Sequence, residues 1–409
     1  MYLTSQQVTQ LDYAGLKTFL EKGYGEGHHL DYKRAPSGDT PSKKKQEFLK
    51  DVAGFANANG GDILIGVDEP ADGLSVEEQT VGVEDGESLA RALERQVGDS
   101  NVIDPRIPGL LVHPVRLPGG RWVVVVHIPP SSGKPHKVDF LKHIHFMQRH
   151  SESTVKMTSF DIREAVLASA TAEGRAQAYA AKQRERLLET MPLGYPAFVL
   201  QATPLVKPES PLDVLSEPVV EVIRGSDRKK RYDGGLFDGF VNTDCHYPIL
   251  EGVCIRERLA ERKARRHEER STADHDRSVA LGRACWLAEF HQNGHVSCAY
   301  SLLREPEKAD DIGLRFWRVG EEHSKLFHAF ADLCDELLAS SRFESPFVVA
   351  CLLTQVGYTR YVTANPFAMR GTEGRAELEW PTALRQPGES FGPIMEDYIR
   401  TLRNAYGLE

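Results

Sequence analysis

Acidic residues near the N-terminus carry the clearest chemistry in this sequence. Glu26 and Asp31 are separated by four residues, Lys33 follows two positions later, and Asp68 and Glu69 come directly after a short apolar run. Clustered carboxylates repel one another unless a positive group neutralises them. Ligand sets made only of oxygen favour Mg²⁺ or Mn²⁺ over Zn²⁺. If these carboxylates converge, they could hold such an ion.

A metal and a lysine beside such carboxylates would suit phosphodiester cleavage. The metal would generate or position hydroxide, and Lys33 would stabilise charge on the phosphorane. The predicted metal ligands are therefore Glu26, Asp31 and either Asp68 or Glu69. The spacing alone leaves a second interpretation open, in which these acids are surface groups paired with ordinary lysines.

The stretch 47–69 has to position these groups. Phe48, Val52, Phe55 and Ala56 recur at helical spacing, which predicts a helix with one buried face. Asn59-Gly60-Gly61 should end that helix, because glycine adopts the left-handed C-cap conformation without steric cost. The apolar run 63–65 then predicts a buried strand that ends at the acidic pair. Residues 29–33 alternate polar and apolar side chains, as a half-buried strand does.

Basic residues surround the same region. Lys43, Lys44 and Lys45 open the predicted helix, where the helix dipole disfavours positive charge. A polyanion nearby would offset that cost. The candidate phosphate ligands are Lys33, Arg34, Lys43, Lys44, Lys45, Lys50 and Arg149.

Length and composition indicate a globular protein of two or three domains. The chain has 409 residues, 41% hydrophobic and 27% charged, with a net charge of −9. That charge does not exclude a local basic groove. No run of 18 apolar residues and no secretory signal are found, so a cytoplasmic protein without a membrane span is expected. The six scattered cysteines are typical of reduced, buried thiols.

The remaining pattern predicts an α+β fold in two domains. Residues 1–165 form a mixed first domain, 166–191 a helical connector, and 192–409 a second α+β domain. The mixed-charge run 256–277 is expected to be a solvated loop or helix. Helices are predicted at 4–22, 88–97, 158–191, 321–341 and 393–406, strands at 122–128, 197–203 and 346–354, and strand pairs at 137–149 and 284–303. Asn293-Gly294 marks the turn of the last pair.

The sequence matches the patterns of two other cofactor sites, for zinc and for ATP, only poorly. Cys245, His246 and Cys254 could bind zinc, but their spacing is poor for a zinc site. No GxxxxGK[ST] motif occurs, and Ser132-Gly133-Lys134 lacks the upstream glycine, so ATP binding through a P-loop is not expected.

Several segments together resemble the Schlafen AlbA_2 domain family. EGHHLDYKR (26–34) and FLKDVAGFANANGGDILIGVDE (48–69) match its Glu-x4-acid strand, its AFAN-type helix end, its Gly-Gly turn and its GV-acid strand end. SESTVKMTS (151–159), after Arg149, is similar to its closing segment. Asp31 stands where the family more often has glutamate, and His150 where it usually has glycine. The resemblance covers roughly residues 10–165.

The resemblance implies a function. In RNA-cleaving members of this family, three carboxylates form the active site. These correspond here to Glu26, Asp31 and Glu69, with Asp68 one position away and Lys33 matching the family's lysine. The leading hypothesis is a metal-dependent endoribonuclease that acts on tRNA or structured RNA in bacterial stress or anti-phage defence. A chain with one such lobe is expected to form a homodimer to complete its RNA groove.

Two further hypotheses stay open. The first is a non-catalytic DNA- or RNA-binding regulator that uses the same lysines. The second is a scaffold whose C-terminal domain binds a protein or a small ligand.

Overall fold

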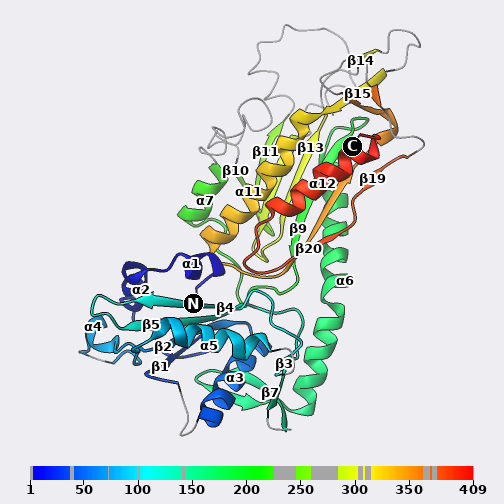
Figure 1. The fold of residues 1–409 in the computed structure, drawn as a ribbon. Helices are drawn as coiled ribbons and strands as arrows, with labels where there is room; N and C mark the ends of the chain where they lie inside the picture. The colour runs from blue at the N-terminus through cyan, green and yellow to red at the C-terminus, as the bar shows by residue number, and fades with distance from the viewer. Residues whose placement is uncertain are drawn as a thin grey trace. The chain divides into compact units, whose positions relative to one another are not determined.

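The structure of the chain, a computed structural model, forms two compact units (Figure 1). One comprises Met1–Glu173, Glu344–Pro346 and Gln386–Glu389; the other comprises Gly174–Phe343, Phe347–Arg385 and Ser390–Glu409. The division falls within the long helix α6 (Ser159–Thr190). Two short segments from late in the sequence thus pack with the first unit. The residues described are 3–36, 41–71, 73–99, 102–140, 143–224, 246–258, 284–302, 307–308, 315–362, 369–370 and 375–408.

A four-stranded sheet forms the centre of the first unit. Its order is β1-β2-β5-β4, in which β1 and β2 run parallel and the other neighbours antiparallel. The strands are β1 (Leu30–Lys33), β2 (Gly61–Ile65), β5 (Trp122–Ile128) and β4 (Leu111–Arg116). Because side chains alternate along a strand, each strand contributes to both faces of this sheet.

The two faces of this sheet carry different cores. One core contains Ile63, Ile65, Val124 and Val126 with apolar residues of α3 (Pro41–Asn57) and α5 (Gly86–Gly98). The other core contains apolar residues from the opposite face of the sheet, together with apolar residues of α1 (Ser5–Thr9) and α2 (Tyr13–Leu20). Figure 1 shows these two helix pairs on opposite sides of the sheet. We call the two sides the α3/α5 face and the α1/α2 face.

A second, smaller sheet packs against α3. Its order is β3-β6-β7-β8, and all its neighbours are antiparallel. The strands are β3 (Ile103–Asp104), β6 (Lys137–Phe140), β7 (His143–His150) and β8 (Ser153–Lys156). A short helix, α4 (Val76–Gln79), lies in the segment after β2.

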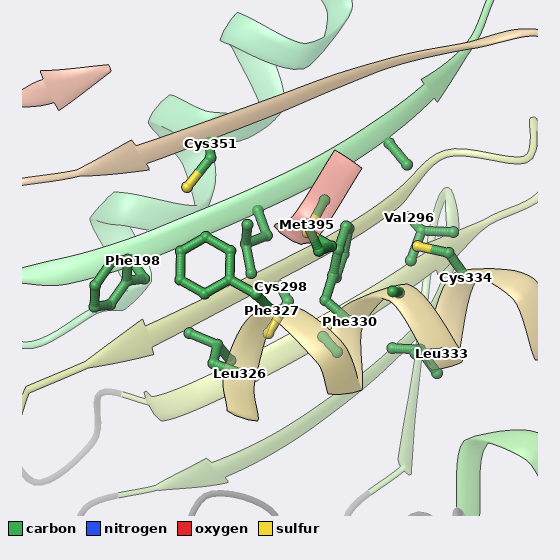
Figure 2. Close-up of a cluster of buried hydrophobic side chains, with 14 of the residues drawn as sticks. Phe198, Val296, Cys298, Leu326, Phe327, Phe330, Leu333, Cys334, Cys351 and Met395 are labelled. Atoms are coloured by element: carbon green, nitrogen blue, oxygen red, sulfur yellow. The ribbon is translucent and has the colours of Figure 1, made fainter. Parts of the chain in front are cut away.

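The second unit is built on an antiparallel sheet of order β10-β11-β12-β13-β9-β16-β19, with β20 also pairing β16. Apolar residues of α7, α11 and α12 share one core with it, part of which Figure 2 shows around Phe198, Phe327 and Phe330. Leu187 and Met191, at the end of α6, pack with a separate set that includes Val199.

The bounds of the elements of the second unit are these. The sheet strands are β9 (Ala197–Pro204), β10 (His246–Ile249), β11 (Gly252–Arg258), β12 (Ala284–His291), β13 (Val296–Ser301), β16 (Phe347–Leu353), β19 (Leu378–Glu379) and β20 (Ala383–Arg385); the helices are α7 (Glu217–Arg224), α11 (Ser324–Ser341) and α12 (Gly392–Ala405). A four-stranded group contains β14 (Glu307–Lys308), β15 (Arg315–Gly320), β17 (Thr359–Val362) and β18 (Met369–Arg370).

The predicted α+β class is confirmed, and most predicted elements occur. The segments 137–149 and 284–303 form antiparallel pairs. The prediction of one helix over 4–22 is wrong, because Asp12 caps a second helix by accepting from Gly15 N. Most of the mixed-charge run 256–277, and Cys245, lie outside the described residues.

Candidate functional site

Asp31 lies on the α3/α5 face and is almost completely buried. Its side chain is 1% exposed. Oδ1 lies 3.1 Å from Nη2 of Arg149, and Oδ2 lies 2.6 Å from Nζ of Lys33. Lys33 is on the same face because it follows Asp31 by two positions in β1. Both oxygens of this predicted metal ligand therefore already face a cation.

Arg149 supports Asp31 and is not part of the predicted phosphate-binding surface. Its side chain is 2% exposed and also donates to the carbonyl oxygens of Gly27 and Leu30, at 3.1 and 3.3 Å. Its guanidinium carbon lies 4.9 Å from the ring centre of Phe55. The sequence does not reveal this burial, because it arises from the packing of β7 against α3.

Asp51 is a site residue that the sequence analysis missed. Its Oδ1 accepts a hydrogen bond from Thr154 Oγ1 at 2.9 Å, and its Oδ2 lies 4.0 Å from Nζ of Lys33. Burial raises the pKa of Asp51 to about 6, despite the favourable charge of Lys33. A signal was present: Asp51 lies three residues after Phe48 and four before Phe55, so an acid stands on the apolar side of the helix.

Of the other predicted carboxylates, Glu26 and Glu69 lie together, whereas Asp68 lies apart from them. Glu26 Oε1 accepts from Tyr32 N at 2.9 Å, and Glu26 N donates to Glu69 Oε1 at 3.4 Å. Partial burial raises the pKa of Glu26, and the charges of Asp31 and Glu69 add to that effect. Asp68 instead pairs with Arg34 at 2.8 Å. The structure thus brings Glu26 and Glu69 together near Asp31.

These side chains do not fit Mg²⁺ or Mn²⁺ as they lie. In the described parts of the chain, no group of three or more His, Cys, Asp or Glu side chains is arranged to hold a metal ion. Asp31 is engaged by two cations, and Glu26 by a backbone N–H group. Metal binding at these carboxylates stays a prediction.

The predicted phosphate ligands occupy different environments. Lys33, Lys44 and Lys45 line one pocket on the α3/α5 face, together with Asp51. Nζ of Lys45 also lies 5.7 Å from the ring centre of Phe140. Lys43 is exposed, whereas Lys50 pairs with Glu47 at 3.0 Å and Arg34 with Asp68.

Motif residues hold this arrangement together. Asn57 donates to the carbonyl oxygens of His136 and Met147, both at 2.8 Å, and its Oδ1 accepts from His136 N. It therefore ties the end of α3 to β7 and to the start of β6. Gly60 has φ +78°, and a Cβ there would lie 2.6 Å from Ile128 O, which confirms the predicted need for glycine.

A second ionic cluster lies on the α1/α2 face. His127 Nδ1 lies 2.8 Å from Asp62 Oδ1, and its Nε2 lies 2.9 Å from Glu344 Oε2. Asp62 and His127 are direct neighbours on β2 and β5. Burial opposes a charged imidazole, but hydrogen bonds to Asp62 and Glu344 outweigh it and raise the pKa of His127 to about 10. This fully buried cluster has no part in the predicted site.

Among the helices described, none is both long enough and apolar enough to cross a lipid bilayer.

Cys254, one of the three residues considered above as zinc ligands, is a buried free thiol.

Comparisons with known proteins bear on the first unit. Residues 26–158 match the family described as "Schlafen, AlbA_2". A search of curated proteins gives no match. Among solved structures, the chain is similar to the N-terminal domain of a protein from Nitrosomonas europaea related to the ATP-dependent DNA helicase RecG. That likeness has 20% identity and a TM-score of 0.25, and covers 36% of this chain and 94% of that domain.

The family match agrees with the motifs of the sequence, since its range contains Glu26, Asp31, Asn57, the Gly60-Gly61 turn and Arg149. It supports a function connected with nucleic acids. Residues 26–158 of this chain thus form a segment that is similar to the Schlafen AlbA_2 family.

Proposed function

We propose that the first unit binds nucleic acid on its α3/α5 face. The observation that carries this proposal is the convergence of Lys33, Lys44 and Lys45 on one pocket within the segment that matches the family. Against these three cations, Asp51 is the one acid of the pocket lining. A phosphate group is the ligand that this excess of positive charge fits best.

The start of α3 supports the same ligand. Lys43, Lys44 and Lys45 stand in its first turns, where the helix dipole makes positive charge unfavourable. A bound phosphate would offset the repulsion. Arg34 and Lys50 contribute less, because neither lines this pocket and the nearest acid to each, Asp68 or Glu47, is exposed or half-buried beside it.

Binding is tested with the full chain and fluorescently labelled RNA and DNA oligonucleotides, by anisotropy at several salt concentrations. We expect Lys44→Glu to weaken binding about tenfold and to reduce the salt slope by about one unit. Lys22→Glu is the matched control, because Lys22 is an exposed lysine that follows α2 on the other side of the sheet. Equal losses in both variants would refute the assignment to this face.

The second candidate function is the endoribonuclease that cleaves tRNA or structured RNA in stress or anti-phage defence. The specific observation in its favour is that Glu69 and Lys33 lie close enough to Glu26 for their charges to act on its carboxyl. The full chain is incubated with tRNA in Mg²⁺, in Mn²⁺ or in EDTA, and the products are resolved on a denaturing gel. Cleavage should be lost in Glu26→Gln and kept in Lys22→Glu. Cleavage that persists in Glu26→Gln would rule out these carboxylates.

Metal dependence and dimer formation remain parts of this proposal. Equal cleavage in EDTA would exclude a divalent ion from the reaction. A homodimer that completes the groove predicts twice the chain mass of 45.6 kDa in light scattering. If the protein is a monomer at the concentration used for the cleavage assay, the proposed homodimer is refuted.

A further inference from the structure

The pocket beside Lys33 has an apolar interior. Its volume is ≈ 210 Å³, and its apolar lining includes Phe48 of α3, Ile63 and Ile65 of β2, and Leu89 and Leu93 of α5. An apolar cavity of about 150 Å³ is large enough to admit benzene. The pocket can therefore receive a flat ring of similar or somewhat larger size.

A polar acceptor is also buried there without a donor. Gln96 of α5 lines the pocket, and within the described residues nothing donates a hydrogen bond to its buried Oε1 atom. A buried acceptor of this kind is unfavourable unless a ligand or water supplies a donor. A ligand with an N–H group on a flat ring would provide one.

The charge of the pocket adds a third requirement. Lys33 from β1 and Lys44 and Lys45 from α3 supply three positive groups, and Asp51 one acid. The apolar side chains therefore fit an uncharged ring, and the lysines fit an anion attached to that ring.

A nucleotide combines these three features. Its base has two apolar faces and an N–H group on its pairing edge, and its phosphate carries negative charge. Unpaired bases are commonly recognised by stacking and edge contacts after they leave the helix. We propose that this pocket receives one unstacked nucleobase, with Gln96 accepting from its pairing edge and the three lysines holding its phosphate. This inference rests on the proposed nucleic-acid binding and specifies that a single nucleotide of the bound strand enters the pocket.

The test uses the full chain and three small probes: adenosine 5′-monophosphate, ribose 5-phosphate and adenosine. Affinities are measured by calorimetry or by ligand-observed NMR. We expect the nucleotide to bind at least tenfold more tightly than either fragment, since each fragment lacks the base or the phosphate. Ribose 5-phosphate binding as tightly as the nucleotide would overturn base recognition, and adenosine doing so would overturn the role of the lysines.

Two variants locate the binding. Leu89→Trp fills the pocket from a half-buried position, and Gln96→Leu removes the acceptor with little change in size. We expect at least a tenfold loss of nucleotide affinity in the first and about a fivefold loss in the second, with melting temperatures confirming that both fold. Unchanged nucleotide affinity in folded Leu89→Trp would refute the proposal.

Oligonucleotides separate this inference from the broader function. Ten-residue adenine strands of RNA and of DNA are titrated against the same variants. Failure of the full chain to bind either strand would refute the proposed function. Salt-dependent binding that falls in Lys44→Glu but is unchanged in Leu89→Trp and Gln96→Leu would keep the function and reject the base pocket. Loss in all three variants supports both, and the two strands show whether RNA or DNA is preferred.

Discussion

The two faces of one sheet use buried charge in different ways. On the α3/α5 face, Asp31 is paired with Arg149 and with Lys33, whose side chain is 26% exposed and lines a pocket. On the α1/α2 face, Asp62 and Glu344 enclose His127, and all three side chains are buried. Neighbouring strands supply Asp31 and Asp62, yet Lys33 beside Asp31 lines a pocket, whereas His127 beside Asp62 is completely buried.

That difference indicates what each cluster does. A buried carboxylate is costly unless it is paired, so both acids need their partners for stability. Through Lys33, the cluster around Asp31 also borders the pocket that Lys44 and Lys45 line. We therefore expect changes on the α1/α2 face to alter stability alone, and changes on the α3/α5 face to alter both stability and binding.

The largest effect is expected for His127→Ala. This change leaves Asp62 and Glu344 buried without their shared partner, which should lower the free energy of unfolding by about 3–5 kcal/mol. Urea denaturation followed by circular dichroism measures it. His143→Ala, at an exposed position, is the control. A loss below about 1 kcal/mol would mean that the cluster is not a structural support.

Arg149→Leu should have the next largest effect. Asp31 keeps Lys33 but loses its buried guanidinium, so we expect a loss of about 3 kcal/mol in the free energy of unfolding. Asp31→Leu combined with Arg149→Leu removes both charges and should cost less than the sum of the two single changes. Additive losses in denaturation experiments would show that the two side chains act independently.

Alkaline pH should weaken the α1/α2 face. The pKa of His127 is raised to about 10, above its ordinary value near 6.5. Its contribution is therefore complete below pH 6.5 and is lost as pH rises toward 10. Between pH 7 and pH 9 the free energy of unfolding should fall by about 2 kcal/mol. Denaturation midpoints of the wild-type chain and of His127→Ala provide the comparison, and parallel pH profiles would contradict the assignment.

The smallest expected effect concerns Asp51 on the α3/α5 face. Burial raises its pKa to about 6, so this carboxyl is negative at pH 7 and mostly neutral at pH 5. The charged groups around it are Lys33, Asp31 and Arg149. Oligonucleotide affinity should rise about threefold from pH 7 to pH 5, because one negative charge leaves the pocket. In Asp51→Asn this part of the pH dependence should disappear, and its persistence in anisotropy titrations would assign it to another group.

Local patterns account for much of what could be predicted. The helix before Asn59, the Gly60-Gly61 turn and the strand after it follow from spacing and from glycine's freedom at positive φ. The pair β12–β13 follows from alternating side chains around Asn293-Gly294. These features depend on residues close in sequence, so one chain segment contains the information.

The candidate site was only partly predictable. Glu26, Glu69 and Lys33 were expected near one another. The parallel pairing of β1 with β2 brings Lys33 to the strand end that precedes Glu69, and hydrogen bonds to Tyr32 N and Glu69 hold Glu26 beside them. Arg149 was expected to contact phosphate, yet it is buried against Asp31. Whether a cation meets an acid or the solvent depends on partners more than a hundred residues away, which spacing does not describe.

The sequence by itself determined α3, the Gly60-Gly61 turn, β2 and β5 of the first unit, its match to a family and the group of charged residues that matter. The tertiary structure alone decided which charges pair. His127 and Glu344 are 217 positions apart, and Asp51 meets Thr154 across 103 positions. The physical reason is that hydrogen-bonding periodicity acts over a few residues, whereas desolvation and ion pairing depend on the whole folded surroundings of each group.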